Sequence, residues 1–135
     1  MTYKIEQIQG VGPYFAERLG LAGVLTSGGL LDQCKTADGL DELELLTGIS
    51  ATQLLTWMHR ADLMRVSGIG PEFGELLEQS GIETVKQLAQ RDPENVLLLM
   101  KRINADKHVT RALPSVKMVA RWAERAKALE PVLMH

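Results

Sequence analysis

A short glycine-proline signature occurs twice in this chain of 135 residues, and it constrains the fold more than any other feature. Residues 10–13 read Gly-Val-Gly-Pro, and residues 68–71 read Gly-Ile-Gly-Pro, an offset of 58 positions. The same offset aligns four further pairs: Phe15 with Phe73, Leu19 with Leu77, Gly23 with Gly81, and Thr26 with Thr84. Self-similarity of this kind indicates two copies of one structural unit.

The correspondence continues toward the C-terminus after a change of register. Ser50 aligns with Ser115 and Trp57 with Trp122, which places an insertion of seven residues in the second copy, around residues 104–110. We therefore predict two repeats, residues 1–60 and residues 61–135. Each repeat ends in a closing helix that carries a tryptophan, and the second closing helix is basic.

Helix signals recur along the chain, whereas no segment alternates apolar and polar residues over the length of a strand. Ser50 with Gln53, and Thr84 with Gln87, have the spacing of a capping box. Residues 50–66 are predicted to form one helix that runs directly into the second glycine signature. The pattern predicts an all-α protein of about ten short helices. We expect two pseudo-symmetric units packed as one compact helical body.

Composition limits the classes of protein that fit. Hydrophobic residues make up 45% of the chain, which is enough for a packed core, and the net charge of −2 argues against an overall basic nucleic-acid binder. The single cysteine, Cys34, excludes an internal disulfide. The chain has no signal-peptide pattern and no apolar run long enough to span a membrane. We therefore predict a cytoplasmic protein.

Charge is divided unevenly between the two ends of the chain. Residues 101–135 carry a net charge of +5, and residues 1–100 carry −7. On the predicted closing helix of the second repeat, Lys117, Arg121 and Arg125 lie four residues apart and form one stripe. Such a stripe can follow a phosphate backbone or meet an acidic partner, and it can equally be a solvated helix face.

Both glycine signatures belong to a longer pattern of apolar and small residues. The spacing is the same in the two copies: Ile5, Ile8, Gly10, Gly12, Ala16 and Leu19 in the first, and Leu63, Val66, Gly68, Gly70, Gly74 and Leu77 in the second. This pattern resembles the helix-hairpin-helix motif, and its duplication resembles the tandem arrangement in DNA repair and recombination proteins. The whole chain looks like a bacterial family of tandem helix-hairpin-helix proteins of unknown function.

The resemblance implies contact with a nucleic-acid phosphate through backbone N–H groups, without sequence preference. Some members of the motif family also hold a monovalent cation on the hairpin carbonyls. The physical features fit, because glycine adopts the backbone angles that a short hairpin needs and the start of a helix presents free N–H groups. The apolar residues between the glycines, Val11 and Ile69, are expected to lie under their hairpins.

Several residues depart from a phosphate-binding hairpin. Pro13 and Pro71 each remove one N–H donor, and Glu72 and Glu75 are expected in the first turn after the second hairpin. Tyr14 and Glu17 stand where a basic residue is often found. Arg18 and Arg65 are the only basic residues near the hairpins. The first hairpin is therefore the better candidate for a phosphate site. In the alternative hypothesis, both glycine pairs serve only to form tight turns.

Other candidate sites are weak. Trp57 and Trp122 are expected in the core, and Cys34 has no activating neighbour in the sequence. The three histidines, His59, His108 and His135, lack metal-ligand spacing. An acidic cluster reads as a solvated helix start: Asp38, Asp41, Glu42 and Glu44. No catalytic signature is present, so we predict a protein that is not an enzyme and needs no metal or cofactor.

Two functions remain open at this stage. The first is a non-catalytic DNA-backbone-binding module, and the second is a protein-interaction adaptor that keeps the fold, has lost the phosphate site, and binds a protein partner or itself. No membrane or small-molecule partner is indicated. The predicted nucleic-acid-binding residues are Gly10, Val11, Gly12, Tyr14, Arg18, Gly68, Ile69, Gly70, Lys117, Arg121 and Arg125.

Overall fold

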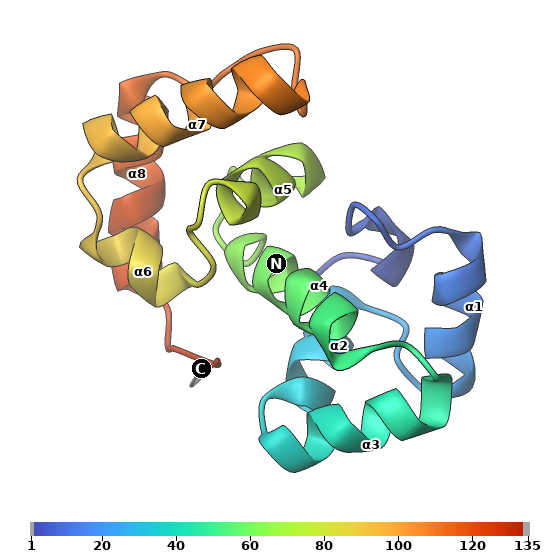
Figure 1. Ribbon diagram of the computed structural model, residues 1–135. Coiled ribbons are helices and arrows are strands. Elements are labelled where there is room, and N and C mark those ends of the chain that lie inside the picture. Colours follow the sequence, from blue (N-terminus) through green and yellow to red (C-terminus); the bar gives the residue numbers. More distant parts are fainter. Residues whose placement is uncertain (1, 134–135) are drawn as a thin grey trace.

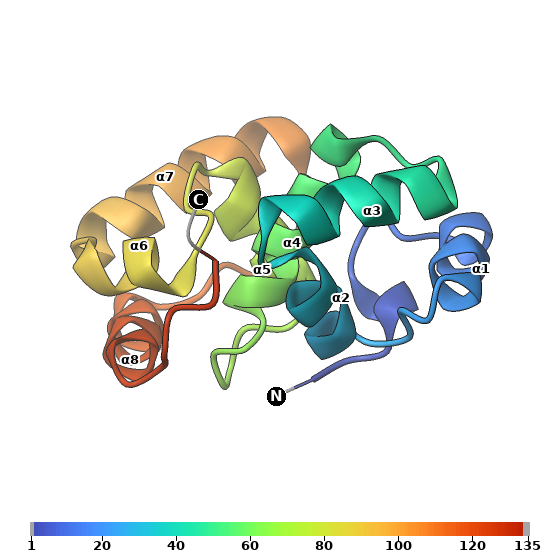
Figure 2. The same ribbon diagram turned by 90° about the horizontal axis from the view of Figure 1, so that it is seen from below.

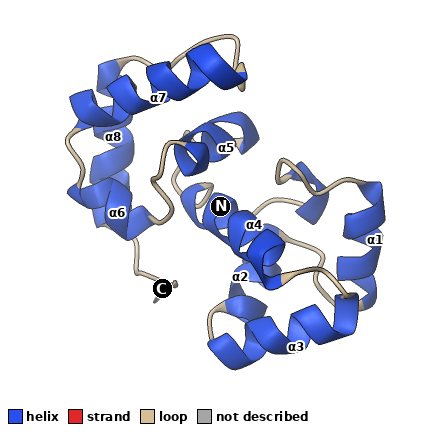
Figure 3. Ribbon diagram, viewed as in Figure 1, coloured by secondary structure: helices blue, strands red, loops and turns tan. Residues whose placement is uncertain are grey.

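A computed structural model describes residues 2–133, and these residues form an all-helical, compact protein (Figures 1 and 3). Beyond helices, the described part contains one isolated antiparallel bridge, between Lys4 and Thr26. The predicted all-α fold is confirmed. The elements are η1 (Ile5–Gln7), α1 (Pro13–Leu21), α2 (Ser27–Cys34), α3 (Ala37–Thr47), α4 (Ala51–Leu63), α5 (Pro71–Gln79), α6 (Val85–Gln90), α7 (Pro93–Lys107) and α8 (Val116–Lys127).

The helix before the first glycine loop is much shorter than the helix before the second loop. It is reduced to the single 3₁₀ turn η1, whereas the full helix α4 precedes the second loop. The described residues thus hold eight α-helices and one 3₁₀ helix, close to the number predicted. Helix α4 ends at Leu63 rather than at Val66. It stops there because Arg65 and Val66 donate to carbonyls three residues back, which tightens the chain into the loop.

Helix α4 lies in the middle of the molecule, with α1, α2 and α3 on one side and α5 to α8 on the other (Figures 1 and 2). Its side chains enter two separate hydrophobic clusters. Met64, directly after the helix, packs with the first cluster, whereas the neighbouring Leu63 packs with the second. Trp57 and Trp122 are buried in the first and second clusters respectively, as predicted. Helix α4 therefore lies between the two cores and contributes side chains to both.

The C-terminal segment crosses back from the second cluster to the first. After α8, the side chain of Leu133 is buried in the first cluster, with Val132 packed against it. Arg65, in the turn after α4, donates a hydrogen bond of 2.8 Å to the carbonyl of Glu130 and fixes the course of this segment. The two halves are thus joined by the chain end as well as by α4.

The residues predicted to be an insertion, 104–110, lie at the end of α7 and in the loop that follows it. Helix α7 has 15 residues, against 11 in α3. The Asn104 side chain bridges the loop, accepting from the Thr110 N–H and donating to the Thr110 carbonyl, each at 3.0 Å. The loop after α7 is therefore held against the C-terminal end of that helix.

The first glycine of each loop packs against the tryptophan of a closing helix. Gly10 has φ +96° and Gly68 has φ +101°, which are angles that other residues rarely adopt. A Cβ atom would lie 3.0 Å from Nε1 of Trp57 at Gly10, and 2.9 Å from Nε1 of Trp122 at Gly68. Both constraints require glycine, so these two positions are explained by the fold alone.

Replacing Gly10 by alanine is expected to lower the free energy of unfolding by about 1–3 kcal/mol, because the backbone is strained and the new methyl group meets Trp57. Gly12→Ala is the matched control: φ is −80° there and no atom lies within 4 Å of the new Cβ, so only the poorer N-cap preference of alanine remains and its effect should be smaller, about 0.5–1 kcal/mol. Urea denaturation of both variants measures the difference, and equal stabilities would contradict this account.

Candidate nucleic-acid interface

The second glycine of each loop, Gly12 or Gly70, is the N-cap residue of the helix that follows. Their φ angles, −80° and −91°, suit any amino acid. A Cβ atom at either position would meet no atom within 4 Å. Unlike Gly10 and Gly68, these two glycines are therefore required neither by backbone conformation nor by packing.

The helices that follow these glycines begin without a side-chain cap. The six other α-helices of the described chain start at a Thr, Ser or Asp whose side-chain oxygen accepts a hydrogen bond from a first-turn N–H. No side chain does this at α1 or α5. Proline occupies the first position of both helices, so the open donors are the N–H groups of the next two residues.

One buried apolar residue anchors each glycine loop to the core. Val11 and Ile69 are buried under the first and second loop, as predicted, and only their backbones can face a ligand. At the first loop, the ring of Tyr14 is 65% exposed and the Arg18 guanidinium lies over it, 5.5 Å from the ring centroid. Arg18 also donates from Nε to the carbonyl of Thr47 at 2.6 Å. Its guanidinium is therefore partly used in closing the C-terminal end of α3.

The basic stripe of α8 reaches the second loop through one of its residues. Arg125 donates from Nη1 to the carbonyl of Ser67 at 2.6 Å, directly before Gly68. Lys117 and Arg121 are exposed on the same stripe and have no hydrogen-bond or ion-pair partner among the described residues.

The acidic residues near the second loop are engaged by other groups. Glu72 is in the first turn of α5, and its carboxylate accepts a hydrogen bond of 3.1 Å from the Thr110 hydroxyl. Glu75 was also expected in the first turn, but α5 begins at Pro71 and Glu75 lies in the next turn. Its carboxylate is 3.8 Å from the Arg60 guanidinium. One of the two predicted repulsive charges therefore lies away from the open helix end.

Arg60 is a neighbour of the first loop that the sequence analysis did not identify. Its guanidinium donates to the carbonyl of Gln9 at 2.7 Å and pairs with Glu78 at 2.8 Å. Arg60 follows Trp57 by three residues, just as Arg125 follows Trp122, so both loops receive an arginine from their closing helix. The spacing of three residues between tryptophan and arginine is the sequence feature that could have identified Arg60. The difference is that carboxylates neutralise Arg60, whereas the hydrogen bond of Arg125 goes to a carbonyl.

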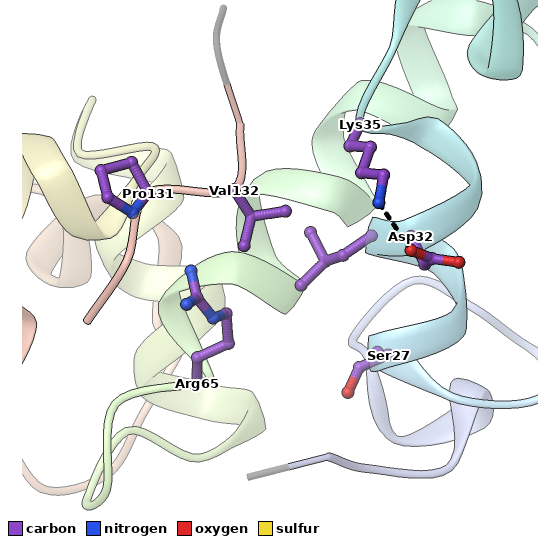
Figure 4. A pocket seen from close by; sticks show the side chains of 8 residues that line it. Ser27, Asp32, Lys35, Arg65, Pro131 and Val132 are labelled. Carbon is purple, nitrogen blue, oxygen red and sulfur yellow. Dashed lines mark hydrogen bonds and ion pairs between the residues drawn. The ribbon is translucent and has the colours of Figure 1, made fainter.

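A hollow of about 480 Å³ lies between α2 and the C-terminal segment (Figure 4). Its two cations are already engaged by the protein. Lys35 pairs with Asp32 at 2.9 Å, and Arg65 binds the carboxylate of Asp62 and the carbonyl of Glu130. We therefore interpret the hollow as part of the joint between the two halves.

Other residues singled out in the sequence were also located. Among residues 2–133, no three His, Cys, Asp or Glu side chains come together in a group that could hold a metal ion, and no helix is long and apolar enough to cross a membrane. His59 lies 3.4 Å from Glu83, and His135 is outside the described residues. Cys34 is a buried free thiol in the first core.

Burial raises the pKa of the Cys34 thiol from its ordinary value of 9.0 to about 11. We expect the native protein to react slowly with a disulfide reagent at neutral pH and rapidly after denaturation, with Cys34→Ser as the blank. The thiol of the unfolded chain ionises at a lower pH than the buried thiol. The contribution of the buried, neutral thiol to the free energy of unfolding is therefore complete below pH 9 and is lost between pH 9 and about 11. Rapid labelling of the native protein would contradict the buried position.

Comparison with known proteins gives one finding. No curated protein and no solved structure matches the chain significantly. A family described as "Domain of unknown function (DUF4332)" matches residues 9–129, which include both glycine loops and all of α1 to α8. The chain therefore belongs to this family of unknown function.

Proposed function

We propose that this protein is a non-catalytic module that binds the DNA backbone without sequence preference, through two helix-hairpin-helix units. The observation that carries the proposal is the pair Gly12 and Gly70. They are glycines at N-cap positions that neither conformation nor packing requires, at the two α-helix starts without a side-chain cap in the described chain. Glycine at such a position lets another molecule approach the backbone closely.

A phosphate oxygen is the chemical group that best fits an open helix start. It accepts hydrogen bonds from first-turn N–H groups, as a capping side chain does, and its negative charge is stabilised by the positive end of the helix dipole. Phosphate is common to every nucleotide, so contacts of this kind position a nucleic acid without reading its sequence. The unpaired Lys117 and Arg121 supply the cations that such binding needs.

The two loops would contribute in different ways. The first turn of α1 contains no acidic residue, so its N–H groups act on phosphate without local repulsion. The first turn of α5 contains Glu72, but this loop also has Arg125, the last residue of the α8 stripe, beside it. We therefore expect α1 to bind mainly through backbone donors and the second loop mainly through charge.

An aspartate at either open helix start should separate binding from stability. In Gly12→Asp or Gly70→Asp, the new carboxylate can accept the first-turn N–H groups, so stability should change by only a few tenths of a kcal/mol. The same carboxylate would occupy the phosphate position, and affinity should fall by about tenfold or more. Fluorescence anisotropy with single-stranded, duplex and four-way-junction DNA at low salt measures the affinity.

Ala37→Asp is the matched control, because it adds the same charge at the start of α3, away from both loops. It should leave DNA affinity nearly unchanged. Wild-type protein that binds none of the three DNA forms at low salt would refute the proposal, and so would full affinity in both glycine variants.

Removing the two unpaired cations of α8 should weaken binding equally for unrelated DNA sequences. For Lys117→Ala with Arg121→Ala, the slope of log affinity against log salt concentration should decrease by about one for each lost phosphate contact. Lys86→Ala with Arg91→Ala, two exposed cations on or beside α6, is the control of equal charge. Identical slopes for both double variants would place the DNA elsewhere.

A further inference from the structure

Four leucines are strongly exposed where the C-terminal ends of α1 and α3 meet. We call Leu21, Leu25, Leu45 and Leu46 the leucine corner; their exposed fractions are 84%, 65%, 86% and 62%. The two helix ends are tied together, because Arg18 in the last turn of α1 donates to the carbonyl of Thr47, the last residue of α3. Single exposed leucines are ordinary, but several at one corner indicate a contact surface.

The leucine corner has an acidic border. Glu17 precedes Leu21 by four residues on α1, and on α3 Asp41 precedes Leu45 and Glu42 precedes Leu46 by the same distance. Side chains four residues apart on a helix are neighbours, so each of these leucines lies beside a carboxylate. All three carboxylates are exposed and have no ion-pair partner among the described residues.

A second apolar surface, with the opposite charge, lies at the other end of the molecule. A hollow of about 280 Å³ is lined by Leu97, Leu98, Val116, Lys101 and one acid, Glu94. Leu98 is 55% exposed, and Arg102 follows it by four residues on α7. Lys117 follows Val116 directly on α8. We call this surface the basic groove.

We propose that the leucine corner of one copy of this chain docks in the basic groove of a second copy. The two surfaces match in chemistry, since leucines bordered by acids would meet leucine and valine bordered by bases. They cannot meet within one molecule, because α3 and α7 lie at opposite ends of it (Figure 1). A contact between two different surfaces is heterologous, so the assembly grows head to tail.

This inference does not depend on nucleic-acid binding, and it is tested without DNA. Sedimentation velocity of the wild type, from micromolar to submillimolar concentration at low salt, should show a mass that rises with concentration. High salt should weaken the association, because exposed charges at the border are screened. A wild type that stays monomeric over the whole range at low salt would overturn the proposal.

Complementation between two variants identifies the geometry. Leu45→Ser with Leu46→Ser removes the corner and keeps the groove, whereas Leu98→Ser removes the groove and keeps the corner. Each variant alone should be monomeric, and an equimolar mixture should form a dimer through the one intact junction. If the Leu98 variant associates like the wild type while the corner variant does not, the corner binds its own copy and the head-to-tail arrangement is wrong.

Charge reversal gives the same test without changing apolar residues. Asp41→Lys with Glu42→Lys, and separately Lys101→Glu with Arg102→Glu, should each weaken association, and their mixture should restore it. Circular dichroism confirms that each variant is folded before its mass is measured. A mixture that remains monomeric in both series would overturn the proposed pairing of surfaces.

Discussion

The guanidinium of Arg60 connects three parts of the chain on which the rest of the structure depends. It is nearly buried, donates to the Gln9 carbonyl in the first loop, and pairs with Glu78 on α5. A buried cation without such partners would be strongly destabilising, so its position and theirs are determined together. Because Arg60 is on α4, the first glycine loop, the central helix and the second half are held in one arrangement.

The two glycines of each loop have different physical roles. Gly10 and Gly68 allow a positive φ and close contact with a tryptophan, so they belong to the core. Gly12 and Gly70 satisfy no internal requirement and leave a helix start open. Tight packing therefore explains Gly10 and Gly68, whereas the proposed anion site rests on Gly12 and Gly70. The proposed interface follows from the second pair alone.

Partners within the fold, and not position in the sequence, determine which charged side chains remain unpaired at the surface. Of the arginines near the loops, Arg18, Arg60 and Arg65 are drawn to carbonyls or carboxylates of the protein. Lys117 and Arg121 remain unpaired in the described chain. The acidic border of the leucine corner is also unpaired, at the other end of the molecule. The net charge of −2 therefore conceals two surfaces of opposite sign at different places on the molecule.

The sequence by itself determined the all-α class, the capping residues of α4 and α6 and the burial of both tryptophans, because helix periodicity, capping and apolar spacing are local properties. It did not determine the partners of charged side chains. Arg60 had no visible role, and the contact of Arg125 with the second loop was not predicted. These depend on how α4, α5 and α8 pack across long sequence separations. Only the tertiary structure decided which cationic side chains pair with groups of the protein and which remain exposed without a partner in the described chain.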